Sequence, residues 1–141
     1  MLDTQRHVRE GFTLIEMLIA VAIMVILGAV AIPYFTGQLE SSKKKTARAT
    51  VRTLGGLVDQ YEADHGKYPD TLKDLVKRPA DEEVARNWTQ YLKGSDVPKD
   101  PWNKPYHYQV TPDAEHPYEL YSYGSKQGKN TPASERISVW D

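Results

Sequence analysis

The most prominent feature of the hydrophobicity pattern is an apolar run near the start of the chain. The segment Gly11–Pro33, GFTLIEMLIAVAIMVILGAVAIP, contains one carboxylate, Glu16, and is apolar from Met17 to Ile32. It is long enough to cross a bilayer, which takes about 20 helical residues. It has no polar face of period 3.6, unlike a helix on the surface of a soluble protein. We therefore expect a helix that lies in lipid or is buried on all sides by other helices.

A second pattern follows the apolar run, because polar residues return and apolar ones recur at helical spacing. Val51, Leu54, Val58 and Tyr61 are separated by steps of three and four residues. This spacing predicts one apolar stripe on an otherwise polar helix, which continues to about Ala63. The stripe needs a partner, and we expect the C-terminal part of the chain to supply it.

Glycine and proline punctuate this helix and end it. Gly37 is a point where the helix can bend or melt, and Gly55-Gly56 can admit a strand close to the backbone, since each glycine weakens a helix by roughly 1 kcal/mol relative to alanine. Gly66 suits a left-handed cap and Pro69 prevents continuation. We expect the long helix to stop at about residue 65.

The rest of the chain predicts short elements separated by turns. Three prolines between Pro98 and Pro105 indicate an extended, turning loop. The expected elements are a short helix at 71–77, a further helical turn at 81–86, antiparallel strands at 106–110 and 118–123, and a third short strand or closing segment at 137–140. The predicted fold is α+β: a long N-terminal α-helix, with a membrane-spanning first half, packed on a small antiparallel β-sheet.

Composition limits the choice of function. The chain has 141 residues, enough for one small domain beside the apolar helix, and its 18 basic and 19 acidic residues give a net charge of −1. This balance does not favour nucleic-acid binding. The absence of cysteine excludes disulfides and thiolate metal sites. The four histidines show no zinc-site spacing, and no phosphate loop or nucleophile motif is present, so we expect no enzyme activity.

Glu16 is the informative residue of the apolar run. A carboxylate in a membrane helix costs about 2.5 kcal/mol or more unless it is paired or lies near the interface. One interpretation places it at headgroup level, solvated. Another requires a cut between Gly11 and Phe12, because the new α-amine would then lie within reach of Glu16 on one helix face or from a neighbouring copy.

The residues around this carboxylate resemble a known signal. Gly11-Phe12-Thr13-Leu14-Ile15-Glu16 and the apolar run after it resemble the class III signal of type IV pilins and type II secretion pseudopilins. The resemblance implies that a membrane peptidase cleaves between Gly11 and Phe12, that Phe12 is N-methylated, and that Glu16 pairs with a neighbouring N-terminus during filament assembly. Pro33 matches a position where the helix of this superfamily is often kinked.

The C-terminal part resembles the major pseudopilins of type II secretion. Asp100-Pro-Trp-Asn-Lys-Pro-Tyr106 is similar to their Asp-Pro-Trp-Gly-x-Pro-Tyr segment, and Asn103 tolerates the positive φ of the usual glycine. The family has an aspartate-rich, calcium-binding loop after Ser-x-Gly. Here Lys126 and Arg136 stand at positions of aspartates, so we expect calcium binding to be absent or weak and no other cofactor. Hydrogen bonds, or an ion pair from Lys126 to a nearby acid, would then hold the loop.

The resemblance also implies an organisation and a function. Residues 1–11 would be a cleaved leader, 12–35 the transmembrane and filament-core helix, 36–65 its amphipathic continuation, and 66–141 a globular domain with a C-terminal β-sheet, in a type IV pilin-like fold. The chain would be a structural subunit of the type II secretion pseudopilus, a helical homopolymer that drives export of folded proteins. The implied partners are further copies of itself, minor pseudopilins, prepilin peptidase, the inner-membrane assembly platform and, indirectly, the outer-membrane secretin.

Location follows from the same resemblance and conflicts with a charge count. The resemblance implies a single-pass protein of the bacterial inner membrane, with its C-terminal domain in the periplasm, that joins the pseudopilus after assembly. Lys43, Lys44 and Lys45, which closely follow the apolar run, would by charge alone place that domain in the cytoplasm. We favour the periplasmic orientation.

Two other functions remain open from the sequence. The main alternative is a type IV or competence pilin for adhesion or DNA uptake, which the lysine run supports. The lysines can also be interpreted as a solvated helix face, or as partners of acidic residues on adjacent subunits. A minor pseudopilin at the filament tip ranks lower. Trp88 and Trp102 could form an aromatic-binding platform, but packing is the better interpretation.

Overall fold

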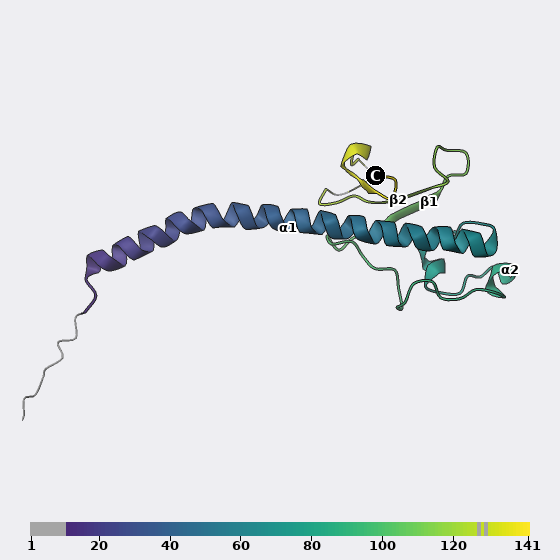
Figure 1. Cartoon of the computed structure of the whole chain (residues 1–141), viewed down its shortest axis with the longest axis horizontal. Coiled ribbons are helices and arrows are strands. Elements are labelled where there is room, and N and C mark those ends of the chain that lie inside the picture. Colours follow the sequence, from purple (N-terminus) through teal and green to yellow (C-terminus); the bar gives the residue numbers. More distant parts are fainter. Residues whose placement is uncertain (1–10, 127, 129) are drawn as a thin grey trace, which may run out of the picture. The chain divides into compact units, whose positions relative to one another are not determined.

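The computed structural model describes residues 11–126, 128 and 130–141 (Figure 1). The described residues form two compact units, one ending at Leu39 and the other comprising Glu40–Asp141. Of the expected leader, only Gly11 is among them. The elements, in chain order, are helix α1 (Leu14–His65), 3₁₀ turn η1 (Leu72–Leu75), helix α2 (Glu82–Ala85), strands β1 (His107–Val110) and β2 (Tyr118–Ser122), 3₁₀ turn η2 (Ala133–Glu135) and strand β3 (Ile137–Ser138).

Helix α1 is continuous through the residues that were expected to weaken it. Pro33 lies inside the helix, where its ring removes one backbone donor. The hydroxyl of Thr36 donates to the carbonyl of Pro33 at 2.9 Å. Gly37 also has helical backbone, so the expected melting there is wrong.

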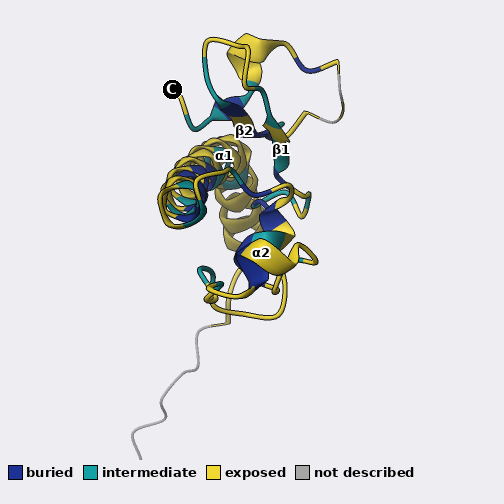
Figure 2. Cartoon of the chain, turned by 90° about the vertical axis from the view of Figure 1, so that its right-hand side faces the viewer, coloured by how far each residue is buried: buried dark blue, intermediate teal, exposed yellow. Residues whose placement is uncertain are grey.

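The apolar stripe of α1 forms one side of the hydrophobic core of the second unit. Val51, Leu54, Val58 and Tyr61 are at most 2% exposed, as their spacing predicted (Figure 2). Their buried partners come from the turns and strands that follow: Leu72, Leu75, Val84, Tyr106, Tyr118 and Leu120. Burying a side chain of this kind contributes about 1.5–3 kcal/mol, so this core, which lies wholly within residues 40–141, is what holds the unit together.

A small antiparallel sheet packs against this stripe through its central strand. Strand β2 pairs with β1, with Val110 opposite Tyr118, and with β3, with Ser122 opposite Ile137. Four of the five residues of β2 are buried. The hydroxyl of Tyr118 donates to the Asp59 carboxylate at 3.0 Å, which ties the sheet to α1. The predicted strands are confirmed, with ends one or two residues shorter.

Gly55 allows the chain after β3 to approach the helix. A Cβ built on Gly55 would lie 2.5 Å from Cγ2 of Val139, whereas one on Gly56 would meet no atom within 4 Å. The backbone N–H of Val139 donates to the carbonyl of Leu120 at 3.0 Å, and this bond holds the segment after β3 in place beside α1. The predicted close approach is confirmed for Gly55 and wrong for Gly56.

The expected helix at 71–77 forms only the 3₁₀ turn η1. The Asp74 carboxylate accepts from the backbone N–H of Thr71 at 2.8 Å and closes the turn in a capping box. The carbonyl of Leu75 would bond residue 79 in an α-helix, but that residue is Pro79 and has no N–H. It accepts instead from the N–H groups of Tyr91 and Leu92 at 3.1 and 2.9 Å.

Candidate functional site

The first turn of α1 is closed by reciprocal hydrogen bonds between Thr13 and Glu16. The Glu16 carboxylate accepts from the backbone N–H and the hydroxyl of Thr13 at 3.0 and 3.1 Å, and the Glu16 N–H donates to Thr13 Oγ1 at 3.3 Å. This is a capping box, which satisfies backbone donors at a helix start. In the uncleaved chain Glu16 therefore has a partner within its own helix. The sequence argument missed it, although the Thr-x-x-Glu spacing is its signature.

The two residues of the expected cleavage site are accessible. Phe12 is 80% exposed, and Gly11 precedes the helix. A Cβ built on Gly11 would meet no atom of the described residues within 4 Å. The contacts of the described residues therefore give no steric reason for glycine at this position.

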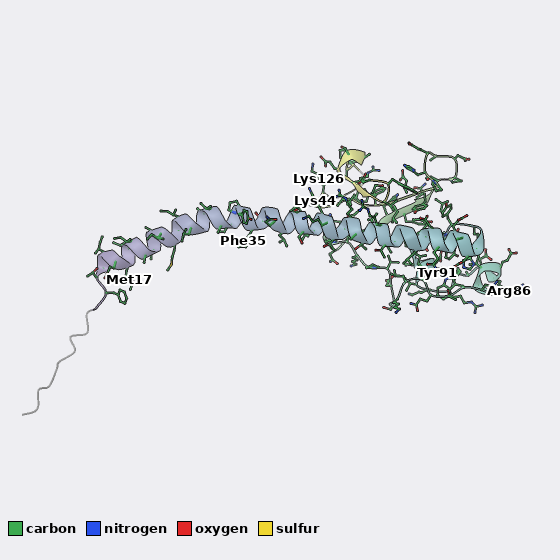
Figure 3. The ribbon with its side chains drawn as sticks, in the orientation of Figure 1. Met17, Phe35, Lys44, Arg86, Tyr91 and Lys126 are labelled. Carbon is green, nitrogen blue, oxygen red and sulfur yellow. The ribbon has the colours of Figure 1, made fainter. Side chains whose placement is uncertain are left out.

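The helical part of the first unit presents a mostly apolar surface. Every large hydrophobic side chain from Phe12 to Leu39 is more than half exposed, including Met17 and Phe35 (Figure 3). The helix is long and apolar enough to cross a membrane, by its length and composition. Such a surface is unfavourable in water, by about 25 cal/mol for each Å², so it requires lipid or other helices around it.

The Asp-Pro-Trp turn is organised by a buried carboxylate. Asp100, which is 4% exposed, accepts at Oδ1 from the backbone N–H groups of Trp102 and Lys104 at 3.0 and 2.8 Å. Its Oδ2 accepts from the hydroxyl of Ser122 on β2 at 2.6 Å. Asn103 has the expected positive φ of 64°. Asp100 therefore joins the turn to the central strand, a contact that sequence spacing alone does not reveal.

The tryptophans that could have formed a binding platform have structural partners. The indole N–H of Trp88 donates to the carbonyl of Asp74 at 2.7 Å, and that of Trp102 donates to the Glu40 carboxylate at 3.2 Å. Trp140, in the closing segment of the chain, donates from its indole N–H to the carbonyl of Tyr118 at 2.9 Å and stacks on His116. These contacts support packing as the role of the tryptophans.

The C-terminal loop, defined as residues 124–136, is held by side-chain cations. Lys126 pairs with the Glu135 carboxylate at 2.7 Å, which confirms the expected ion pair. Lys104 donates from Nζ to the carbonyls of Gly124 and Lys126, each at 3.4 Å. Arg136 donates from Nε to the carbonyl of Thr131 at 3.1 Å.

This loop does not offer the donors that calcium needs. Calcium takes six to eight oxygens, with carboxylates supplying the negative charge. Glu135 is engaged by Lys126, and Asp141 accepts from the backbone N–H of Ser138 at 2.9 Å. Within residues 11–126, 128 and 130–141, no three His, Asp or Glu side chains are grouped to hold a metal. The residues present therefore do not fit a calcium ion.

The basic run of α1 borders a polar cleft. Lys44 and Arg48 line a cavity of about 370 Å³ together with Lys126 and Arg136 from the C-terminal loop (Figure 3). Among the described residues that line it, Glu135 is the one acidic residue, and Tyr123 is aromatic. The cleft is basic, and the tryptophans of the unit pack elsewhere.

Comparisons with known proteins identify first the class and then the family. Residues 6–32 match the prokaryotic N-terminal methylation motif. The fold resembles the crystal structure of the major pseudopilin from the type 2 secretion system of enterohaemorrhagic Escherichia coli, with a TM-score of 0.60 and 24% identity over 78% of this chain and 96% of that chain. The chain therefore has a pseudopilin fold behind a methylation motif. Residues 34–140 match the family of type II secretion system (T2SS), protein G, and the chain belongs to that family.

Curated relatives support this assignment over most of their length. The type II secretion system core protein G of Pseudomonas aeruginosa is 35% identical, over 97% of this chain and 99% of the relative. The protein of the same name from Vibrio cholerae is 32% identical, over 83% of this chain and 81% of the relative. The predicted fold class and the suspected family are confirmed.

Proposed function

We propose that this chain is a structural subunit of a type II secretion pseudopilus and not a catalyst. It polymerises through its N-terminal helix, and filament growth helps to drive folded proteins across the outer membrane. The observation that carries the proposal is an apolar helical segment with exposed side chains, joined to a unit that has its own core, in a member of the protein G family. The helix supplies an assembly surface, and the cored unit remains folded outside it.

Processing creates the assembling form. A prepilin peptidase cleaves between Gly11 and Phe12, removes residues 1–11, and methylates the new N-terminus. The accessible Phe12, a glycine that the fold does not require at position 11, and the match to the methylation motif support this step. Mass spectrometry of the membrane-extracted protein tests it, because the cleaved and methylated form has a defined mass.

Glu16 guides assembly once Phe12 is the N-terminus. The Glu16 carboxylate leaves or shares its contact with Thr13 and pairs with the α-amine of a neighbouring copy. The carboxylate then faces a full positive charge, which attracts it more strongly than the neutral donors of Thr13 do. This attraction favours copies whose helices are in register.

The remaining partners and the location follow from this role. The chain spans the inner membrane once, with residues 40–141 in the periplasm. There it meets the assembly platform and minor pseudopilins before it enters the pseudopilus, and it acts on the outer-membrane secretin only indirectly. The apolar helix and the methylation motif support membrane anchoring.

Deletion of the gene in its own host tests this function. We expect exported proteins to vanish from the medium and accumulate in the periplasm, as followed by mass spectrometry, while surface pili persist. Unchanged secretion with loss of pili, motility or DNA uptake would contradict the proposal and favour the pilin alternative, which the comparisons do not support.

A further inference from the structure

The start of the C-terminal loop is fixed to the Asp-Pro-Trp turn by a short chain of hydrogen bonds. Ser122, which is fully buried, donates to the buried Asp100 carboxylate at 2.6 Å and accepts from the backbone N–H of Gly124 at 3.0 Å. Gly124 has a φ of 68°, which turns the chain out of β2. The carbonyls of the first loop residues are thereby held close to the turn that carries Lys104.

The Lys104 ammonium group gathers the carbonyls that this arrangement presents. Lys104 is partly buried, and its Nζ donates to the oxygens of Gly124 and Lys126. An ammonium ion has three donors and no acceptor. It can therefore hydrogen-bond to several backbone carbonyls that point toward one place. A metal ion coordinated by backbone oxygens meets the same requirement.

A second cation joins the two ends of the loop. Lys126 lies near its start and Glu135 near its end, and the Lys126 ammonium group is 2.7 Å from Oε2 and 2.8 Å from Oε1 of Glu135. Just beyond Glu135, the Arg136 guanidinium lies 4.7 Å from the centre of the Tyr121 ring. A divalent ion brought here would meet three positive side chains, and like charges repel one another.

We propose that the ammonium groups of Lys104 and Lys126 replace a divalent ion as the cations that close the C-terminal loop. Lys104 takes the role of binding the backbone oxygens, and Lys126 takes the role of joining the loop's two ends. The fold of this chain is then independent of calcium. This inference concerns the folded unit and goes beyond the role in secretion.

Thermal unfolding of the full chain in detergent tests the inference first. Near-ultraviolet circular dichroism reports the tryptophans of the folded unit. We expect the same Tm in excess EGTA and in millimolar calcium. A calcium-dependent rise in Tm of several degrees would overturn the proposal, because a ligand that binds only the folded state raises stability by RT ln(1 + [L]/Kd).

The substitution Lys104→Met tests the carbonyl-binding cation. It keeps the aliphatic stem and removes the charge, and we expect Tm to fall by roughly 4–8 °C, the shift of an ordinary destabilising change in a domain of about 100 residues. Proteinase K should then cut the loop faster. Lys93→Met, at an exposed lysine, is the matched control and should behave as the wild type. An unchanged Tm and cleavage rate in Lys104→Met would overturn the role of Lys104.

A charge exchange tests the second cation even if Lys104→Met fails to fold. Lys126→Glu should accelerate proteolysis of the loop, because it places two carboxylates together, and so should Glu135→Lys. The double substitution restores the pair with its signs reversed and should restore slow cleavage. If the double variant is cleaved as fast as the faster-cleaved single variant, the pair does not close the loop.

Discussion

Glu16 has two possible partners, and they belong to different stages of the protein's life. In the described chain it caps α1 through Thr13. After cleavage it has a nearby cation in the N-terminus of a neighbouring copy. Capping needs only a hydrogen-bond acceptor, whereas pairing needs a negative charge, so the two roles can be separated by substitution.

Glu16→Gln keeps an acceptor for the capping box and removes the charge. We expect Glu16→Gln to be cleaved and inserted normally but to assemble and secrete at least tenfold less, as Glu16→Ala should. Cleavage is measured by mass spectrometry, and assembly by sheared filament yield. Normal assembly by Glu16→Gln together with failure of Glu16→Ala would assign the residue to capping alone.

Gly55 and Gly56 form an adjacent pair with opposite predictions. Gly55→Ala forces Val139 to move and should cost about 1–3 kcal/mol of unfolding free energy. Gly56→Ala meets no neighbour and should stabilise the helix by up to about 1 kcal/mol. Denaturant unfolding in detergent measures both. Val139→Ala should rescue Gly55→Ala in part, and equal effects at the two glycines would contradict the packing described.

At the scale of the elements, α1 and the segments packed against it carry several tyrosines whose pKa values are raised. Burial raises the pKa of Tyr61 to about 12, with the nearby Asp74 carboxylate adding to the effect. Burial likewise raises the pKa of Tyr91 to about 12, and raises that of Tyr118 still further. Each shift stabilises the fold only while the phenol keeps its proton.

The consequence is a loss of stability at alkaline pH. An unfolded tyrosine ionises near pH 10, so between about pH 10 and 12 the unfolded chain releases protons that the folded chain retains, and stability falls as pH rises. Below pH 10 this contribution is fully present. Absorbance of phenolate at 295 nm and circular dichroism should change together above pH 10. Ionisation of all nine tyrosines near pH 10 in a chain that stays folded would contradict this burial.

The success of prediction also differed between elements. The stripe of α1 and the strands were predictable because burial imposes a period on the residues themselves. The short helix at 71–77 was not, since its end depends on Leu75 bonding to Tyr91 and Leu92, which come much later in the chain. The continuity of α1 through Gly37 was also not predictable from the sequence. One glycine lowers helix propensity only slightly, and the residues around it can outweigh that effect.

The same distinction applies to the candidate site. Gly11, Phe12 and Glu16 are adjacent, and their motif is visible in the sequence. The bonds from Asp100 to Ser122, and from Lys104 to the loop, join residues about twenty positions apart. They depend on the register of β2, which no local pattern specifies. The ion pair of Lys126 could be predicted from the sequence, but the contacts of Lys104 with the loop carbonyls could not.

In the whole molecule, the proposed function gives the two units separate tasks. The apolar helix assembles copies by packing against the same helix of its neighbours, and the cored unit coats the filament. No cysteine is present in the chain, so a single introduced cysteine reports contacts between copies without interference.

The most direct measurement is therefore a cysteine scan of the apolar helix in cells that make the secretion machinery. Substitutions such as Val25→Cys, at exposed positions between Met17 and Leu39, are treated with an oxidant in intact membranes. We predict disulfide-linked dimers at a subset of positions spaced by three or four residues, and their loss when Glu16→Gln is added. Monomer alone at every position would contradict assembly through this helix.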